Sequence, residues 1–241
     1  MKNKFGFILV KTQLGENIGA CARSMKNFGF SKLHIVSPKI NFPNHKTKAT
    51  SVGAYDIIND AKVFNNVEKA IEPFNLVIAL SARRRDINKK HISLQNFQNI
   101  IKKRKNLNIG LMFGPEASGL SNQDLSFSNY IMQISTSQKF KSLNLSHSLT
   151  IICYEIFKLM RDNKIKNNNL DLKVSSKAKI NNIVKQLIYL LEKKNFFRPK
   201  EKKRSMLLNI NNLIYKLQPN DKELRILASI ISSLSKNKNK A

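Results

Sequence analysis

Short apolar runs alternate with helical patterns along the first 160 residues. This alternation restricts the folds open to the chain more than any other feature of the sequence. Between the runs, apolar residues recur three or four positions apart, as in amphipathic helices. Alternation of this kind predicts an α/β fold in which helices cover a mostly parallel sheet. The runs with the length and branched apolar content of buried strands are Phe5 to Val10, Leu33 to Val36, Leu76 to Leu80, Ile109 to Phe113 and, with a weaker pattern, Ile131 to Ile134.

The chain changes character after the last of these runs. Residues 176–241 show only helical periods, so we expect a small all-helical module there. Three consecutive asparagines, Asn167 to Asn169, interrupt the periodicity just before it. We therefore predict a domain over residues 1–160, a linker over 161–175 and a basic helical extension that binds RNA over 176–241.

The charge of the chain is strongly positive. Lys and Arg number 43 against 15 Asp and Glu, which gives a formal net charge of +28 in 241 residues. A genome rich in lysine codons would raise the lysine count without any functional demand, but it does not by itself explain so few acids. The balance therefore favours a nucleic acid as partner.

Other classes of protein are disfavoured by the sequence. Cys21 and Cys153 have no second Cys or His at ligand spacing, so we expect reduced thiols and no metal site. No run approaches the ~20 apolar residues that span a bilayer, and the first residues lack the pattern of a cleavable signal. We expect a cytoplasmic protein with no membrane partner.

The segment from Asn17 to Gly29 follows the first strand and is typical of a helix of about three turns. Asn17 is a good N-cap residue, and Gly29 suits the position just beyond the C-terminus of a helix. Gly19 lies one turn before Arg23 on the same face, which predicts room for something to dock beside the arginine. On this pattern alone, an ordinary surface helix with a solvated arginine explains the segment equally well.

The segment from Leu111 to Leu120 carries a buried strand into a loop with two glycines, Gly114 and Gly119. Ligands of open parallel sheets bind beyond the carboxyl ends of strands, where glycines let backbone groups approach closely. The loop lacks the spacing of a dinucleotide fingerprint or a P-loop. A tight turn in which Glu116 caps a following short helix is the alternative interpretation.

The segment from Ser142 to Ser148 lies between the weakest strand and an apolar helix that ends near Met160. Its Ser and Asn residues favour a polar nest for a ligand at a helix N-terminus. A plain helix start accounts for the same residues. We expect His147 to be structural rather than catalytic.

Together the three segments resemble the motifs of the SPOUT superfamily of RNA methyltransferases, and within it the tRNA ribose methyltransferases of the TrmJ type. Asn17 to Gly29 is similar to the first motif, Phe113 to Leu120 to the second and Ser142 to Leu145 to the third. They occur in the same order and at similar separations. The resemblance continues through the helical tail and is nearly full length.

The resemblance implies an α/β domain whose C-terminal part threads a trefoil knot, a homodimer, and S-adenosylmethionine (AdoMet) bound in the knot. It also implies an active site that is completed across the dimer interface. No metal is implied. Carried over to this chain, the residues that hold the cofactor, largely through backbone groups of three loops, are Leu80, Ser81, Ala82, Gly114, Glu116, Ile134, Ser142, Leu143 and Asn144.

By the same resemblance Arg23 is the catalytic arginine, with Asn17 beside it. A guanidinium with a pKa above ~12 rarely gives up a proton, so we prefer Arg23 as an electrostatic clamp on a phosphate and on developing alkoxide charge. Ser142 or water would then accept the proton of the 2′-hydroxyl. The chain departs from the family at two places: it has Ala117 where many relatives carry Arg, and Ser146-His147-Ser148 where they carry small apolar residues. These departures concern the fine shape of the cofactor pocket.

The expected reaction is therefore AdoMet-dependent methylation of a tRNA ribose 2′-hydroxyl, on cytidine or uridine at nucleotide 32 of the anticodon loop. A catalytically silent RNA-binding or ribosome-assembly protein on the same scaffold is an alternative from another class. A third interpretation keeps the enzyme and moves its target to ribosomal RNA or to another tRNA position.

Overall fold

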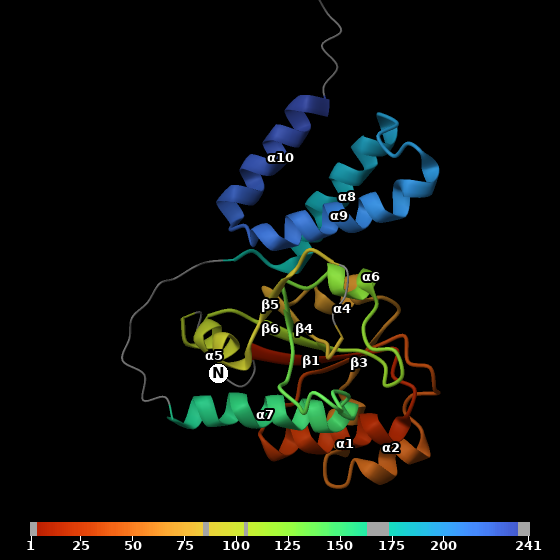
Figure 1. Cartoon of the computed structure of the whole chain (residues 1–241), viewed down its shortest axis with the longest axis vertical. Helices are drawn as coiled ribbons and strands as arrows, with labels where there is room; N and C mark the ends of the chain where they lie inside the picture. Colours follow the sequence, from red (N-terminus) through yellow and green to blue (C-terminus); the bar gives the residue numbers. More distant parts are fainter. Residues whose placement is uncertain (1–3, 84–86, 104–105, 163–173, 236–241) are drawn as a thin grey trace, which may run out of the picture.

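A computed structural model describes residues 4–83, 87–103, 106–162 and 174–235 of the chain. Seven strands form one sheet in the order β3-β2-β1-β6-β4-β7-β5, and every neighbouring pair is parallel (Figure 1). The strands are β1 (Phe5–Val10), β2 (Leu33–Val36), β3 (Lys62–Phe64), β4 (Leu76–Leu80), β5 (Lys90–Ile92), β6 (Ile109–Phe113) and β7 (Tyr130–Met132).

The predicted α/β class and parallel sheet are confirmed, and four of the predicted strands match residue for residue. The fifth, expected at Ile131 to Ile134, is β7 at Tyr130–Met132. Strands β3 and β5, which form the two edges of the sheet, were not predicted from the sequence. Each has only three residues, most of them exposed, so neither carries an apolar run.

Alternate residues of the strands enter two separate cores, one on each face of the sheet. In β1, for example, Phe7 and Leu9 lie in one core, and Ile8 and Val10 lie in the other. Because successive side chains of a strand point to opposite faces, an apolar run such as β1 must be covered by helices on both sides.

The helices divide between these two faces. One core includes residues of α1 (Gly15–Asn27), α3 (Tyr55–Asn59), α5 (Leu94–Lys103) and α7 (Leu145–Asp162), and α2 (His45–Thr50) packs on α1 at the outside. The other core includes residues of α4 (Val67–Ile71), α6 (Asn122–Ser126), α8 (Lys177–Lys193), α9 (Lys203–Leu217) and α10 (Asp221–Ser235). Figure 1 shows α1, α2 and α7 on one side of the sheet and α8, α9 and α10 on the other.

The C-terminal part is all-helical, as expected, and it packs directly against the second face of the sheet. A 3-10 turn, η2 (Lys200–Lys202), precedes α9. The backbone N–H of Lys177 donates to the carbonyl of Phe74 (2.9 Å), and the Asn129 side chain donates to the carbonyl of Tyr215 (2.9 Å). Both Lys177 and Tyr215 are fully buried. Most of the predicted linker, residues 163–173 with Asn167 to Asn169, lies outside the described residues.

Both cysteines are free thiols within the first core, as expected. Burial raises the pKa of each thiol, so neither is activated as a nucleophile. Within the described residues, no helix has the length and apolar content that crossing a bilayer requires.

Candidate functional site

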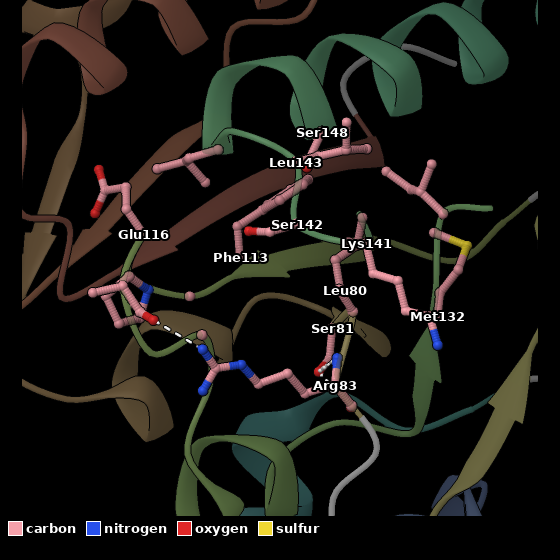
Figure 2. A pocket seen from close by; sticks show the side chains of 17 residues that line it. Leu80, Ser81, Arg83, Phe113, Glu116, Met132, Lys141, Ser142, Leu143 and Ser148 are labelled. Atoms are coloured by element: carbon pink, nitrogen blue, oxygen red, sulfur yellow. Dashed lines mark hydrogen bonds between the residues drawn. The ribbon is translucent and has the colours of Figure 1, made fainter. Parts of the chain in front are cut away.

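An open pocket lies beyond the carboxyl ends of the neighbouring strands β4, β6 and β7 (Figure 2). It encloses about 750 Å³, including space continuous with solvent. Ligand sites of open parallel sheets form at this edge, because the loops that leave adjacent strands meet there. The lining residues are Leu80, Ser81, Ala82, Arg83, Phe113, Gly114, Pro115, Glu116, Ala117, Gly119, Met132, Ile134, Lys141, Ser142, Leu143, Leu145 and Ser148.

The pocket brings together three segments that are far apart in the sequence. Eight of the nine residues predicted to hold a cofactor line it, and only Asn144 does not. They are Leu80, Ser81 and Ala82 after β4, Gly114 and Glu116 after β6, and Ile134, Ser142 and Leu143 after β7.

The loop after β6 turns back on itself at its two glycines. A Cβ atom at Gly114 would lie 2.3 Å from the backbone nitrogen of Leu120, so a side chain does not fit there. Gly119 has a φ of +65°, which L-residues rarely adopt, and its N–H donates to the carbonyl of Pro115 (2.9 Å). Gly114 therefore permits a close approach of the loop to itself, and this turn places Glu116 on the pocket wall.

Glu116 does not cap the helix that follows it, so that alternative is wrong. Ser121 and Asp124 form the capping box of α6. The Glu116 carboxylate instead accepts hydrogen bonds from the side chain of Asn17 (2.7 Å) and from the backbone N–H of Gln13 (3.0 Å). It thereby connects the loop after β6 to the start of α1.

Asn17 does not cap α1, which corrects the sequence prediction. The helix begins two residues earlier, at Gly15, with Leu14 as its N-cap residue. Asn17 is buried within the first turn, where its amide donates to Glu116 and its side-chain oxygen accepts from the amide of Asn144 (3.1 Å). A residue type that favours caps is used here as a polar link between loops.

The other end of α1 follows the prediction. Gly29 has a φ of +74°, its N–H donates to the carbonyl of Lys26 (3.0 Å), and the N–H of Phe30 donates to the carbonyl of Met25 (2.8 Å). These two bonds define a Schellman motif with glycine just beyond the helix.

The third motif both starts a helix and joins the polar network. The side-chain oxygen of Asn144 accepts from the backbone N–H and the hydroxyl of Ser146, both at 2.8 Å, so Asn144 caps α7. Its amide donates to Asn17, which in turn binds Glu116. The helix-start interpretation is thus confirmed, and all three motifs meet at Asn17. His147 is exposed and lies outside the pocket lining.

Arg23 is exposed on α1 and does not line the pocket of its own chain, whereas Ser142 does. The space beside Gly19 is not a docking place for a ligand, which corrects a second prediction. A Cβ atom at Gly19 would lie 2.1 Å from the Thr50 hydroxyl and 2.4 Å from the Thr47 carbonyl oxygen. The missing side chain lets α2 pack closely on α1.

Two cations on the pocket wall, Arg83 and Lys141, were not among the predicted site residues. Arg83 belongs to the run Arg83 to Arg85, a pattern that is typical of a solvated basic surface. The one sequence feature that could have indicated a site is its position in the loop after a predicted strand, next to Ser81 and Ala82. Arg84 and Arg85 lie outside the described residues, as do Arg104 and Lys105 of a second basic run, Lys102 to Lys105. Among the described residues, no group of three or more Cys, His, Asp and Glu side chains is placed to hold a metal.

The fold and the site define an α/β protein with an open pocket at the carboxyl edge of a parallel sheet, lined by the loops of three motifs. Residues 4–154 match the model of the SpoU rRNA Methylase family, and the chain belongs to that family.

Relatives and solved structures extend this similarity over nearly the whole chain. The tRNA (cytidine-2′-O-)-methyltransferase TrmJ of Methanocaldococcus jannaschii is 34% identical over 175 residues, which cover 71% of this chain and 74% of that protein. The tRNA (cytidine/uridine-2′-O-)-methyltransferase TrmJ of Photorhabdus laumondii is 28% identical over 98% of both chains. The crystal structure of TrmJ from Z. mobilis ZM4 superposes with a TM-score of 0.85 at 29% identity and covers 96% of this chain and 99% of its own.

Proposed function

We propose that this chain transfers the methyl group of AdoMet to the ribose 2′-hydroxyl of a tRNA pyrimidine, at nucleotide 32 of the anticodon loop. The observation that carries the proposal is the convergence of the three motif segments on one pocket at the carboxyl edge of the sheet. The near full-length similarity to tRNA 2′-O-methyltransferases supports the substrate class.

The pocket lining fits the cofactor in its chemistry. Apolar side chains and polar groups contribute comparable shares of the lining, which suits a ligand that has both apolar and charged parts. The apolar side chains of Leu80, Ile134 and Leu143 would hold the adenosine part, while Ser142 and loop backbone groups would orient it. When bound, AdoMet supplies an electrophilic methyl group on a cationic sulfur.

The path of the chain around this pocket supports the proposed trefoil knot. β7 pairs with β4 and β5, two strands that precede it by dozens of residues, and the segment after β7 returns to line the pocket beside the loops after β4 and β6. In the proposed knot, the segment that carries Ser142 and Leu143 is the part of the chain that has been threaded.

A homodimer would place Arg23 at a pocket that it does not reach in its own chain. Arg23 is exposed on α1, which packs against α7 in the outer layer of the molecule (Figure 1). The same layer exposes apolar surface: Tyr154 of α7 is about half exposed, and its ring lies 6.1 Å from the ring of Phe28. We propose that this surface pairs with a second copy, so that Arg23 of one copy serves the pocket of the other.

Arg23 would act as a clamp rather than as a base. Methyl transfer needs the ribose oxygen in line with the methyl group, and the leaving thioether needs no proton, so positioning dominates. The guanidinium of Arg23 would bind the adjacent phosphate with two hydrogen bonds and stabilise negative charge as it develops on the 2′-oxygen. Ser142, on the pocket wall, or a water molecule would accept the proton.

We further propose that residues 1–160 form the methyltransferase domain and that 176–241, joined by a linker over 161–175, add a basic surface for tRNA. A cluster of exposed cations, Arg198, Lys200, Lys202 and Arg204, lies where α9 begins, and Lys102 and Lys103 are exposed on α5. Such side chains bind the phosphates of a folded RNA without reading its sequence.

One observation favours a second target. The family whose model matches residues 4–154 is named for the methylation of ribosomal RNA, so ribosomal RNA is the competing substrate. A catalytically silent RNA-binding protein is the competing class.

Two measurements separate these functions. Calorimetry should detect AdoMet binding to the purified protein, and a silent scaffold would bind none. Labelled methyl groups should then enter tRNA transcripts at a 2′-oxygen and leave ribosomal RNA fragments unlabelled; the reverse labelling would replace tRNA by ribosomal RNA as the substrate.

A further inference from the structure

Arg83 spans the mouth of the pocket. Its guanidinium Nη2 donates to the backbone carbonyl of Ala117 (3.1 Å), so a residue that follows β4 is joined to the loop that follows β6. Figure 2 shows the side chain reaching along the pocket wall from the loop of Ser81 toward the loop of Glu116. The arginine is exposed, so its guanidinium is open to solvent and to a ligand.

The backbone of Arg83 is held in place by Ser81. The Ser81 hydroxyl donates to the carbonyl of Arg83 (3.0 Å) and accepts from its N–H (3.3 Å), while the Ser81 N–H donates to the carbonyl of Met132 in β7 (3.0 Å). The backbone of Arg83 is therefore fixed to the edge of the sheet. Only the side chain has to move for the guanidinium to exchange the Ala117 carbonyl for another acceptor.

The charges on the pocket wall are not balanced. The charged residues that line it are Arg83, Glu116 and Lys141, and the Glu116 carboxylate already accepts from Asn17 and Gln13. No carboxylate of the described residues forms an ion pair with Arg83. A guanidinium has five N–H donors in a planar fork that matches a carboxylate, and a single neutral carbonyl uses little of this capacity.

We propose that Arg83 is a cofactor-positioning residue that binds the carboxylate at the methionyl end of AdoMet. The inference rests on the proposed function, because that function supplies the cofactor. Before binding, the bond to the Ala117 carbonyl keeps the guanidinium at the mouth; on binding, the fork exchanges that carbonyl for the stronger, charge-assisted pair with the carboxylate.

The test compares ligands that differ only in this carboxylate. Dissociation constants are measured by calorimetry for AdoMet and for decarboxylated S-adenosylmethionine, which keeps the sulfonium and the amine. Arg83→Gln should raise the dissociation constant for AdoMet at least tenfold and leave that for the decarboxylated ligand unchanged. Arg83→Lys should recover part of the loss. Lys139→Gln, at an exposed residue outside the pocket lining, removes the same charge and should change neither constant.

Equal weakening of both ligands by Arg83→Gln would overturn the inference, because Arg83 would then only shape the loop. It would also be overturned if both constants stayed at the wild-type value while tRNA binding without cofactor weakened, since Arg83 would then contact a phosphate. Failure of the wild-type chain to bind AdoMet would instead remove the proposed function itself.

Discussion

The side chain of Asn17 donates a 2.7 Å hydrogen bond to the carboxylate of Glu116, a residue 99 positions further along the chain. Glu116 lines the pocket, and Asn17 lies behind it in the first turn of α1. Since Asn17 also accepts from Asn144, this one buried amide fixes the relative positions of the three motifs. The network gives the pocket its shape before any ligand arrives.

Asn17→Asp should disrupt this network more than Asn17→Ala. The aspartate would set a second carboxylate against Glu116, and like charges at that distance oppose each other's ionisation. Losing the hydrogen bonds alone should lower the free energy of unfolding by about 1–3 kcal/mol. We expect the aspartate variant to melt at a lower temperature and to bind AdoMet at least tenfold more weakly. Asn65→Asp, at an exposed residue, is the control; equal effects in all three variants would contradict the role given to Asn17.

Gly19→Ala should destabilise the protein. The new methyl group would lie 2.1 Å from the Thr50 hydroxyl and 2.4 Å from the Thr47 carbonyl oxygen, so α2 must shift. Overpacking of this kind costs about 1–3 kcal/mol, more than the roughly 1 kcal/mol by which alanine favours a helix over glycine. Urea denaturation measures the difference. Adding Thr50→Ala should recover little, because the backbone carbonyl remains; unchanged stability in Gly19→Ala would show that α2 moves freely.

Two buried lysines predict a pH dependence of stability. Burial, with Lys216 nearby, holds the pKa of Lys89 at about 7, and burial beside Lys89 lowers the pKa of Lys177 well below its ordinary value. The unfolded chain, in which the pKa returns to 10.5, binds more protons than the folded chain between pH 7 and that value. The free energy of unfolding should therefore fall as the pH drops from 10.5 to 7, by on the order of a few kcal/mol.

Lys177→Met should stabilise the protein near pH 7. The Nζ atom of Lys177 has no hydrogen-bond partner within the described structure and lies 4.5 Å from the centroid of the Tyr215 ring, so an apolar side chain of similar length suits the site better. We expect a gain of about 1–3 kcal/mol and a flatter pH profile, measured by urea denaturation at several pH values. Lys222→Met, at an exposed residue, should change neither. A loss of stability in Lys177→Met would contradict this expectation and show that the buried amine of Lys177 stabilises the fold.

Affinity for tRNA should fall steeply with salt. If the exposed cations bind several phosphates, the logarithm of the association constant decreases linearly with the logarithm of the salt concentration, with a slope of about −0.9 for each phosphate neutralised on a duplex. Filter binding between 50 and 200 mM salt should give roughly a hundredfold loss or more. A flat response would refute the electrostatic account of tRNA binding.

Arg23→Lys should lower turnover at least tenfold and leave AdoMet binding unchanged. Lysine keeps the charge but loses the planar fork that grips a phosphate with two hydrogen bonds. Arg23 does not line the pocket of its own chain, and its proposed partners at the pocket of the second copy are the phosphate and the 2′-oxygen of the tRNA, so AdoMet binding measured without tRNA should not change. Near-full turnover with unchanged RNA affinity would mean that the two-bond clamp is wrong.

The sheet could be predicted from the sequence where its strands are buried on both faces. A run such as Phe5–Val10 is apolar throughout because both neighbouring layers are apolar. The edge strands β3 and β5 have exposed residues and pair on one side only, so they leave no such run. A run of apolar residues in the sequence indicates a strand that is buried. Short edge strands are mostly exposed, so no such run marks them.

The site could be predicted only in part, for a related reason. The residue pattern alone indicated the segments that contain Gly114 and Ser142, and the rest of the predicted pocket wall came from the family resemblance. Local cap preference gave Asn17 the wrong role, because its partners Glu116 and Asn144 are 99 and 127 positions away in the sequence. Arg83 was hidden in a run of three arginines, and only the approach of Ala117 distinguishes it from a solvated cation.

The most direct test of the central claim is a map of ribose 2′-O-methylation in tRNA from cells with and without this protein. We predict that a methylated cytidine or uridine at nucleotide 32 of the anticodon loop disappears when the gene is deleted. It should return with the wild-type chain and stay absent with Arg23→Ala. A tRNA methylation map that is identical in both cells, with the missing methyl group found in ribosomal RNA, would contradict the account.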